Sequence, residues 1–203
     1  MACLPLIGLL VGCAVASPSD PNFTARDRRE LANPPYQTAA ISPAYRRQIV
    51  KYHRQEAPGS ILVDPRGPYV YFVLPGGKAI RYGATVGEDA LVWSGVVTVG
   101  RKEEWPRWTP TPNERRKFGP LPPYVEGGAH NPLGSRALYL YSDGKDTLYR
   151  IHGTNQPEHI GRGVSFGCIR ITNEDAIDLY RRVAVGAVVV VLAETRSAAR
   201  SAQ

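Results

Sequence analysis

The chain consists largely of short runs of β-branched and aromatic residues, and each run ends at glycine, proline or aspartate. Such residues favour strands, because their side chains pack well on a pleated sheet. With 20 glycines and 18 prolines in 203 residues, turns are frequent and long helices are disfavoured. We therefore predict a mainly β fold with a few helices, of the α+β class. The predicted strands are residues 60–64, 69–74, 78–83, 95–99, 137–141, 147–151 and 187–192.

Helical patterns are fewer. The clearest covers residues 173–183, where Thr172 is placed to cap the first turn and Asp175 occupies the third helical position. Residues 22–32 and 42–53 are also compatible with helices, with an asparagine and a serine as their candidate N-caps. The first of these is polar nearly all round, which predicts a loosely held helix.

These patterns divide the chain into four parts. We expect a leader over residues 1–16, an N-terminal helical extension over 17–57, a strand-rich domain over 58–193 and a polar tail over 194–203. Within the domain, residues 101–128 are rich in proline, tryptophan and charge, and we expect them to form a long loop or flap. Loops of this length inside a compact domain are usually functional.

The first 16 residues carry no charge, and their apolar run is too short to span a bilayer. This is typical of a secretory signal peptide. The ending Ala14-Val15-Ala16 suits cleavage by ordinary signal peptidase, whereas Leu10-Val11-Gly12-Cys13 resembles a bacterial lipobox with Cys13 as the lipidated residue. We expect an exported protein of the periplasm or cell envelope, attached to a membrane only through a lipid on Cys13.

Removal of the leader leaves Cys168 as the single cysteine of the folded part, and an unpaired thiol in a secreted domain indicates reactivity. The net charge of +7 arises from basic residues scattered among acids, without an arginine-rich arm. This pattern argues against nucleic acid as the partner and favours an anionic polymer or a carboxylate-bearing substrate.

The segment with most chemical information pairs His152 with Cys168. A cysteine attacks only as the thiolate, and a histidine within hydrogen-bond reach can take the thiol proton and later return it to a leaving amine. A glycine-rich connection, residues 153–167, can bring the two together, and Gly167 lets the backbone N–H groups face an oxyanion. Arg170 adds positive charge near the thiolate and suits a substrate carboxylate. On the residues alone, an inert buried cysteine remains an alternative, whereas zinc is disfavoured by the ligand spacing.

The order of these motifs resembles the L,D-transpeptidase (YkuD-type) catalytic domain over residues 59–193. The resemblance rests on Ile151-His152-Gly153-Thr154-Asn155, on Ser165-Phe166-Gly167-Cys168-Ile169-Arg170, on the run from Gly128 through Asn131-Pro132-Leu133-Gly134, and on Gly161, Asn173, Asp175 and Gly186. It implies a mixed, strand-rich catalytic fold. It also implies a reaction in which the thiol attacks the L,D peptide bond after diaminopimelate in a peptidoglycan tetrapeptide stem and releases D-alanine. A second diaminopimelate amine, or an amine of an outer-membrane protein, then accepts the acyl group.

The resemblance assigns a role to several positions of this sequence. Cys168 would be the nucleophile and His152 the base, oriented by the backbone carbonyl of Gly153. The N–H groups of Gly167 and Cys168 would form the oxyanion hole. Supporting positions of the motif are Ser165, Asn155 and Arg170. No metal and no organic cofactor is implied.

The chain departs from the family pattern at Phe166, where many members have histidine or serine, and at His130, where aspartate is frequent. We interpret His130 as a solvated loop residue in preference to a rim residue. We expect Trp105 and Trp108 to stack on glycan or line the flap, and Trp93, which lies in a strand pattern, to pack in the core. Three rival functions remain: an L,D-carboxypeptidase or wall-linkage hydrolase that uses the same site, a non-catalytic wall-binding lipoprotein, and a papain-like protease. The order of histidine before cysteine disfavours the protease.

Overall fold

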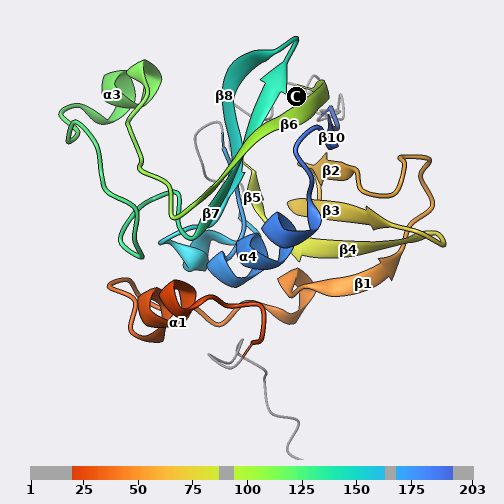
Figure 1. Cartoon of the computed structure of the whole chain (residues 1–203), viewed down its shortest axis with the longest axis horizontal. Coiled ribbons are helices and arrows are strands. Elements are labelled where there is room, and N and C mark those ends of the chain that lie inside the picture. The colour runs from red at the N-terminus through yellow and green to blue at the C-terminus, as the bar shows by residue number, and fades with distance from the viewer. Residues whose placement is uncertain (1–19, 87–93, 163–167, 194–203) are drawn as a thin grey trace, which may run out of the picture.

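The computed structural model describes residues 20–86, 94–162 and 168–193. In these residues ten strands form one mixed sheet in the order β1-β4-β3-β2-β10-β6-β7-β8-β9-β5 (Figure 1). The predicted mainly β fold with a few helices is confirmed. The strands are β1 (Gln48–Lys51), β2 (Ile61–Asp64), β3 (Tyr69–Leu74), β4 (Lys78–Gly83), β5 (Thr85–Val86), β6 (Gly95–Glu104), β7 (Arg136–Ser142), β8 (Lys145–His152), β9 (Ile169–Arg170) and β10 (Val188–Val191).

The described helices are short. They are the α-helices α1 (Ala25–Ala32), α3 (Pro112–Phe118) and α4 (Asn173–Arg182), and the 3-10 turns η1 (Pro43–Tyr45) and η2 (Pro157–His159). Helix α4 packs against β7 and β8 and buries Ile177 and Leu179, while α3 stands away from the sheet on two long connections (Figure 1). None of the described helices has the length and apolar character needed to cross a bilayer.

The strands β3 and β4 form the predicted hairpin. Their antiparallel pairing closes at Leu74 and Lys78, and the turn between them contains Gly76 and Gly77 at φ of +72° and +65°. Only glycine adopts this region of φ without steric cost, so the turn residues and the flanking β-branched runs specify the same structure.

Strand β10 lies at the centre of the sheet and contributes to the apolar core. This strand pairs in parallel with β2 and antiparallel with β6, so the last strand in sequence lies in the middle of the sheet. Its residues Val189 and Val191 are buried in the larger of two apolar clusters, as the continuous apolar run at 187–192 predicts. Burial on this scale is the main favourable contribution to folding.

Two helical predictions need correction in the N-terminal segment. The first helix begins at Ala25, and its cap is Thr24, whose hydroxyl accepts from the backbone N–H of Asp27, so Asn22 is not the cap. The expected helix over residues 42–53 is wrong, because only Pro43–Tyr45 make a 3-10 turn and Gln48–Lys51 form β1 beside β4. The β-branched residues Ile49 and Val50 favour that strand. The segment expected as a purely helical extension therefore contributes an edge strand to the sheet.

The expected loop over residues 101–128 is also partly wrong. Residues 101–104 continue β6, which runs past a bulge at Gly100 and stays paired with β7. The remaining stretch contains helix α3, whose cap Thr111 and third residue Glu114 form a reciprocal capping box. We call residues 106–126 the flap.

Candidate active site

His152 and Cys168 meet because β8 and β9 run in parallel. Ile151 pairs with Ile169 and His152 with Arg170, so the residue just before β9, Cys168, lies beside the end of β8. Both side chains line one cavity of about 220 Å³. The structure thus brings together the two residues that the sequence singled out.

The imidazole of His152 is held by the residue that follows it. Its Nδ1 lies 2.6 Å from the backbone oxygen of Gly153, and His152 is only 3% exposed. A carbonyl oxygen can only accept, so Nδ1 carries the proton and Nε2 is left as the basic nitrogen. The N–H of Gly153 in turn donates to the backbone oxygen of Arg136 on β7, at 3.0 Å.

Asn173, at the start of α4, fixes the backbone around this histidine. Its Oδ1 accepts from the N–H groups of Ser135 (2.8 Å) and Thr154 (3.2 Å), and its Nδ2 donates to the Thr154 carbonyl and to the Tyr36 hydroxyl, each at 2.9 Å. A Cβ built on Gly153 would lie 2.2 Å from the same Oδ1. The glycine after His152 is therefore required by the close approach of Asn173.

Burial keeps both members of the pair neutral in the resting protein. Desolvation lowers the pKa of His152 to about 3, and the positive charge of Arg170 acts in the same direction. Desolvation also raises the pKa of Cys168 to about 11, although Arg150 and Arg170 act against it. The geometry and these pKa values describe a thiol and a neutral imidazole, with proton transfer left to the moment of reaction.

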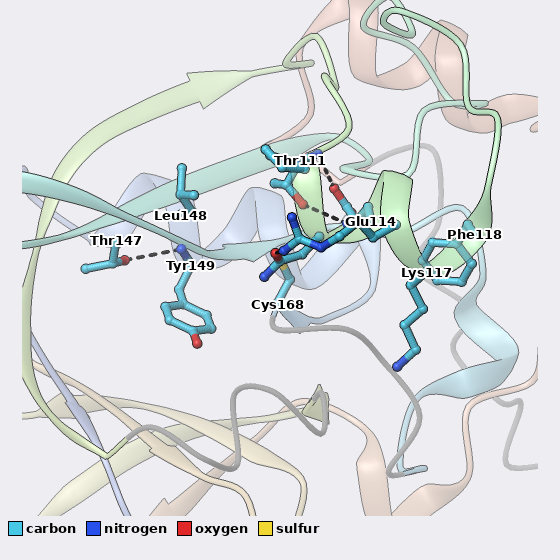
Figure 2. A pocket seen from close by; sticks show the side chains of 11 residues that line it. Thr111, Glu114, Lys117, Phe118, Thr147, Leu148, Tyr149 and Cys168 are labelled. Carbon is cyan, nitrogen blue, oxygen red and sulfur yellow. Dashed lines mark hydrogen bonds between the residues drawn. The ribbon is translucent and has the colours of Figure 1, made fainter.

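Cys168 also lines a second cavity, of about 580 Å³ (Figure 2). Helix α3 forms one wall with Glu114, Lys117 and Phe118, and β8 contributes Leu148 and Tyr149. Leu148 is 55% exposed and has a φ of +64°, a region that β-branched and bulky residues rarely adopt. Cys168 thus lines both cavities, as do Thr111 and Glu114, and His152 lines only the smaller one.

The smaller cavity is lined by four arginines. Arg101 and Arg150 stack on Tyr139, with guanidinium carbons 3.6 and 4.3 Å from the ring centroid. Both also pair with carboxylates, as does the third arginine, Arg107. Arg170 differs, because it forms no ion pair with any carboxylate of the described residues. Its NH1 donates to the amide oxygen of Gln156, at 3.1 Å, and its Nε is buried without a hydrogen bond.

The other predicted site residues have mixed outcomes. Asn155 lines neither of the two cavities and donates from Nδ2 to the backbone oxygen of His130, which is itself exposed. Ser165, Phe166 and Gly167 lie outside the described residues, as does Trp93. No group of three or more histidine, cysteine, aspartate or glutamate side chains able to hold a metal ion occurs in the part of the chain that the structure describes.

Two tryptophans of the expected flap have different environments. Trp108 lines the smaller cavity, whereas Trp105 is buried at 4% exposure and donates from Nε1 to Asp27. A role for Trp105 at the flap surface is therefore excluded.

Several residues at the site were not predicted. Arg150 and Leu148 belong to a strand that the sequence analysis assigned only to the fold, and Glu114 belongs to the presumed loop. Asn173 occurred in the helix start, but its buried hydrogen bonds have no sequence signal. For Glu114 a signal existed, because Thr111 followed three residues later by glutamate is the pattern of a capping box.

Comparisons with known proteins identify the family of this chain. The family model of the L,D-transpeptidase catalytic domain (YkuD) matches residues 58–191, more than half of the chain. The chain therefore belongs to the L,D-transpeptidase family, which consists of transferase enzymes.

Curated relatives include two Escherichia coli K12 proteins. The "Probable L,D-transpeptidase ErfK/SrfK" is 47% identical over 45% of this chain and 29% of its own length. The "Probable L,D-transpeptidase YbiS" is 40% identical over 60% of this chain and 38% of its own length. The chain thus spans less than two fifths of these relatives.

Solved structures share the fold. A Brucella melitensis protein described as a "probable carnitine operon oxidoreductase caia" is 45% identical, with a TM-score of 0.51, over 75% of this chain and 96% of that one. L,D-transpeptidase 3 from Mycobacterium tuberculosis, in complex with a faropenem-derived adduct, has a TM-score of 0.51 at 18% identity, over 68% of this chain and 60% of that one. The second likeness concerns the fold alone.

Proposed function

We propose that this protein is a peptidoglycan L,D-transpeptidase in which Cys168 is the nucleophile and His152 the general base. The observation that carries the proposal is the placement of both side chains on one cavity, with Nδ1 of His152 committed to the Gly153 carbonyl. That hydrogen bond occupies Nδ1 and leaves Nε2 as the basic nitrogen. Membership of the family supports the same reaction class.

In the proposed reaction, the Cys168 Sγ attacks the carbonyl carbon of the peptide bond between diaminopimelate and the terminal D-alanine. Nε2 of His152 takes the thiol proton as the C–S bond forms and gives it to the departing D-alanine nitrogen when the C–N bond breaks. An amine then attacks the thioester carbonyl, loses its proton to Nε2, and expels the Cys168 thiolate, which is reprotonated by His152. The new amide is the cross-link.

The neutral resting pair supports general-base attack in preference to a preformed thiolate. A thiol with a pKa of about 11 is almost entirely protonated near pH 7. The proton must therefore leave in concert with attack, and an imidazole that is neutral at this pH is available to take it. For the oxyanion, we propose the N–H groups of Gly167 and Cys168, as the family resemblance implies.

The arginines of the smaller cavity support a substrate that carries carboxylates. Peptidoglycan stems offer such groups on diaminopimelate and at the terminal D-alanine. We assign Arg170 to one of them, because its guanidinium has donors and no ion pair with a described carboxylate. The acceptor amine is proposed to come from a second stem or from an outer-membrane protein.

Analysis of products on purified muropeptides by mass spectrometry tests this proposal. Tetrapeptide stems should yield free D-alanine and dimers cross-linked between two diaminopimelate residues. Tripeptides without dimers would instead identify an L,D-carboxypeptidase with water as acceptor. Unchanged tetrapeptides, after incubation with a protein shown to be folded, would support the non-catalytic reading.

Acylation by β-lactams gives a second test. The fold neighbour from M. tuberculosis was solved with a faropenem-derived adduct. We expect a carbapenem to give a stable one-to-one adduct on Cys168, seen as a mass increase of the intact protein, and penicillins to react more slowly. If incubation with a carbapenem left both the mass and the activity of the protein unchanged, the result would count against the transpeptidase.

The cellular location belongs to the proposal as well. We propose export to the cell envelope, where peptidoglycan is found, with a lipid on Cys13. Metabolic labelling with a fatty-acid analogue tests this, since a lipidated chain incorporates the label and a Cys13→Ser variant does not. A mature protein that begins at Ser17 without label would instead be a soluble periplasmic enzyme.

A further inference from the structure

We propose that helix α1, through Asp27 as a positioning residue, holds the base of the flap and so sets the shape of the cavity beside Cys168. The effect on turnover rests on the proposed function, but the hold on the flap does not. Helix α1 precedes residue 58, where the family match begins. The contact therefore joins the matched domain to a helix that lies outside it.

The two stems of the flap are tied to each other at its base. Asn131, which is fully buried, donates from Nδ2 to the carbonyls of Pro106 (3.0 Å) on one stem and of Val125 (2.9 Å) and Glu126 (3.0 Å) on the other. Trp108 and Val125 add a reciprocal pair of backbone hydrogen bonds, at 2.9 and 2.8 Å. A displacement of the base therefore moves the flap as a unit.

Helix α1 contacts this base from the outside and at both ends. Asp27 accepts from the indole N–H of Trp105, at 2.9 Å, just before the first stem. Arg26 donates to the Gly127 carbonyl at 2.9 Å, and Glu30 accepts from the Ala129 N–H at 3.2 Å, just after the second stem. Figure 1 shows α1 below the connections that lead to α3.

Of these three α1 residues, Asp27 makes the most hydrogen bonds. Its carboxylate is fully buried and accepts from the Thr24 N–H (2.9 Å), the Trp105 indole and both terminal nitrogens of Arg136, at 2.9 and 2.7 Å. Hydrogen bonds from Arg136 help to hold the pKa of Asp27 below its ordinary value, against the effect of burial. Removing one member of a buried ion pair is costly, because the other charge would stay unpaired.

The same ion pair links the flap to the proposed base. The backbone oxygen of Arg136 accepts from the Gly153 N–H, and the Gly153 carbonyl holds Nδ1 of His152. The backbone at the flap base is closely packed. Trp105 adopts a φ of +44°, and a Cβ on Gly127 would lie 1.8 Å from its carbonyl oxygen.

The flap carries these constraints to the substrate cavity. Glu114, Lys117 and Phe118 of α3 face the side of the cavity opposite Leu148, with Cys168 between them (Figure 2). A small rotation at the base is amplified at α3, so that loss of the α1 contacts should widen or shift this cavity. A role in stability alone would leave the cavity unchanged in every variant that remains folded.

The first experiment measures the flap directly in the full chain. Helix α3 contains Arg115, Arg116 and Lys117, which trypsin can cleave only when the helix opens or moves. Trp105→Phe removes the indole donor but keeps the ring and the Asp27–Arg136 pair, and Asp27→Asn weakens both contacts. We expect both variants to be cleaved in α3 several-fold faster than the parent, as followed by mass spectrometry of the flap peptides.

The matched control is Arg47→Met. Arg47 lies in the same N-terminal segment and pairs with Asp175 and Asp178 of α4, away from the flap. It should lower the thermal midpoint while leaving the α3 cleavage rate unchanged. Should Asp27→Asn fail to fold, Trp105→Phe and Arg26→Met carry the test. The proposal would be overturned if the folded variants of the α1 contacts (Asp27→Asn, Trp105→Phe and Arg26→Met) were cleaved at the parent rate, or if Arg47→Met were cleaved equally fast.

The second experiment separates positioning from stability. Well below their thermal midpoints, the variants of the α1 contacts should show a several-fold higher KM for stem peptide. They should also give a larger share of hydrolysis relative to transfer, because a displaced flap admits water. Arg47→Met should match the parent in both. Faster cleavage with unchanged KM and product ratio would show that α1 holds the flap but does not shape the site. If the parent protein had no transpeptidase activity, the proposed function would be wrong, but the result of the cleavage experiment would still hold.

Discussion

His152 and Arg170 lie opposite each other in the parallel pair of β8 and β9, so a guanidinium stands beside the proposed base. The positive charge opposes protonation of the imidazole, in addition to the larger effect of burial. The same guanidinium favours the Cys168 thiolate. One arginine therefore biases both partners of the proton transfer towards their reactive forms.

Arg170→Met should raise the pKa of His152. The value should stay below the ordinary 6.5, because burial remains the larger cause. The measurement is an NMR titration of the four histidines, with His152 assigned by its loss in His152→Gln. Arg170→Lys is the matched control. It keeps the positive charge, so the pKa of His152 should stay low, but it loses the planar guanidinium that can bind a carboxylate through two hydrogen bonds, so the KM for stem peptide should rise. A His152 pKa that is the same in parent and Arg170→Met would refute the electrostatic role.

Cys168→Ala should abolish turnover and leave the fold intact. A covalent route has no substitute at this position, so we expect a loss on the order of 10³-fold or more in kcat. Circular dichroism and the thermal midpoint should match those of the parent, because the half-buried Cys168 side chain is small. Activity within tenfold of the parent would exclude Cys168 as the nucleophile.

The free energy of unfolding should decrease at both acidic and alkaline pH, because His152 and Cys168 are each buried in the neutral form. The folded-state pKa of His152 is below its ordinary value, so as pH falls from about 6.5 towards 3 the unfolded chain binds a proton that the folded chain refuses. The free energy of unfolding then falls, by up to about 1.4 kcal/mol per pH unit. Cys168 has the opposite sign, with stability lost as pH rises from 9 towards 11.

Urea unfolding at several pH values measures these two limbs. Relative to the parent, His152→Gln should lose less stability between pH 6.5 and pH 4, and Cys168→Ala should lose less above pH 9. Parallel stability curves for the parent and both variants would show that neither group is buried in its neutral form.

Gly153→Ala should destabilise the fold and slow acylation together. Its new Cβ collides with Oδ1 of Asn173, so the hydrogen bonds to Ser135 and Thr154 must lengthen, at a cost of roughly 2–4 kcal/mol. Gly76→Ala is the control. It meets no atom within 4 Å and carries only the strain of a positive φ, about 1 kcal/mol. Equal thermal midpoints for the two variants would contradict the requirement for glycine at 153.

The sequence predicted those parts of the fold that depend on local patterns. The strand runs, the hairpin at Gly76 and Gly77, and the capped helix α4 follow from side-chain shape, backbone freedom and capping. The helix predicted at 42–53 failed because Ile49 and Val50 pair with β4, and long-range pairing overrides a weak helical preference. The flap helix was missed, although its capping box is local.

The site was predictable where its motif is contiguous and unpredictable where it depends on packing. His152 and Cys168 follow from the chemistry of a thiol near an imidazole, and the structure brings them to one cavity. The contacts of Asn173 and the pair of Asp27 with Arg136 join residues far apart in sequence. Neither contact changes the periodicity or composition of the chain, so only the three-dimensional structure reveals them.

The position of β10 has a consequence for the way the chain is made. Residues 188–191 lie between β2 and β6, so until they are synthesised the sheet remains two separate halves, each with an exposed edge. A growing chain therefore gains the full cooperativity of this sheet only after β10 has been made, and its contacts are largely between distant residues. Under the proposed export route, this order of synthesis favours a chain that is still unfolded, and so able to pass through a translocation pore, until β10 is complete.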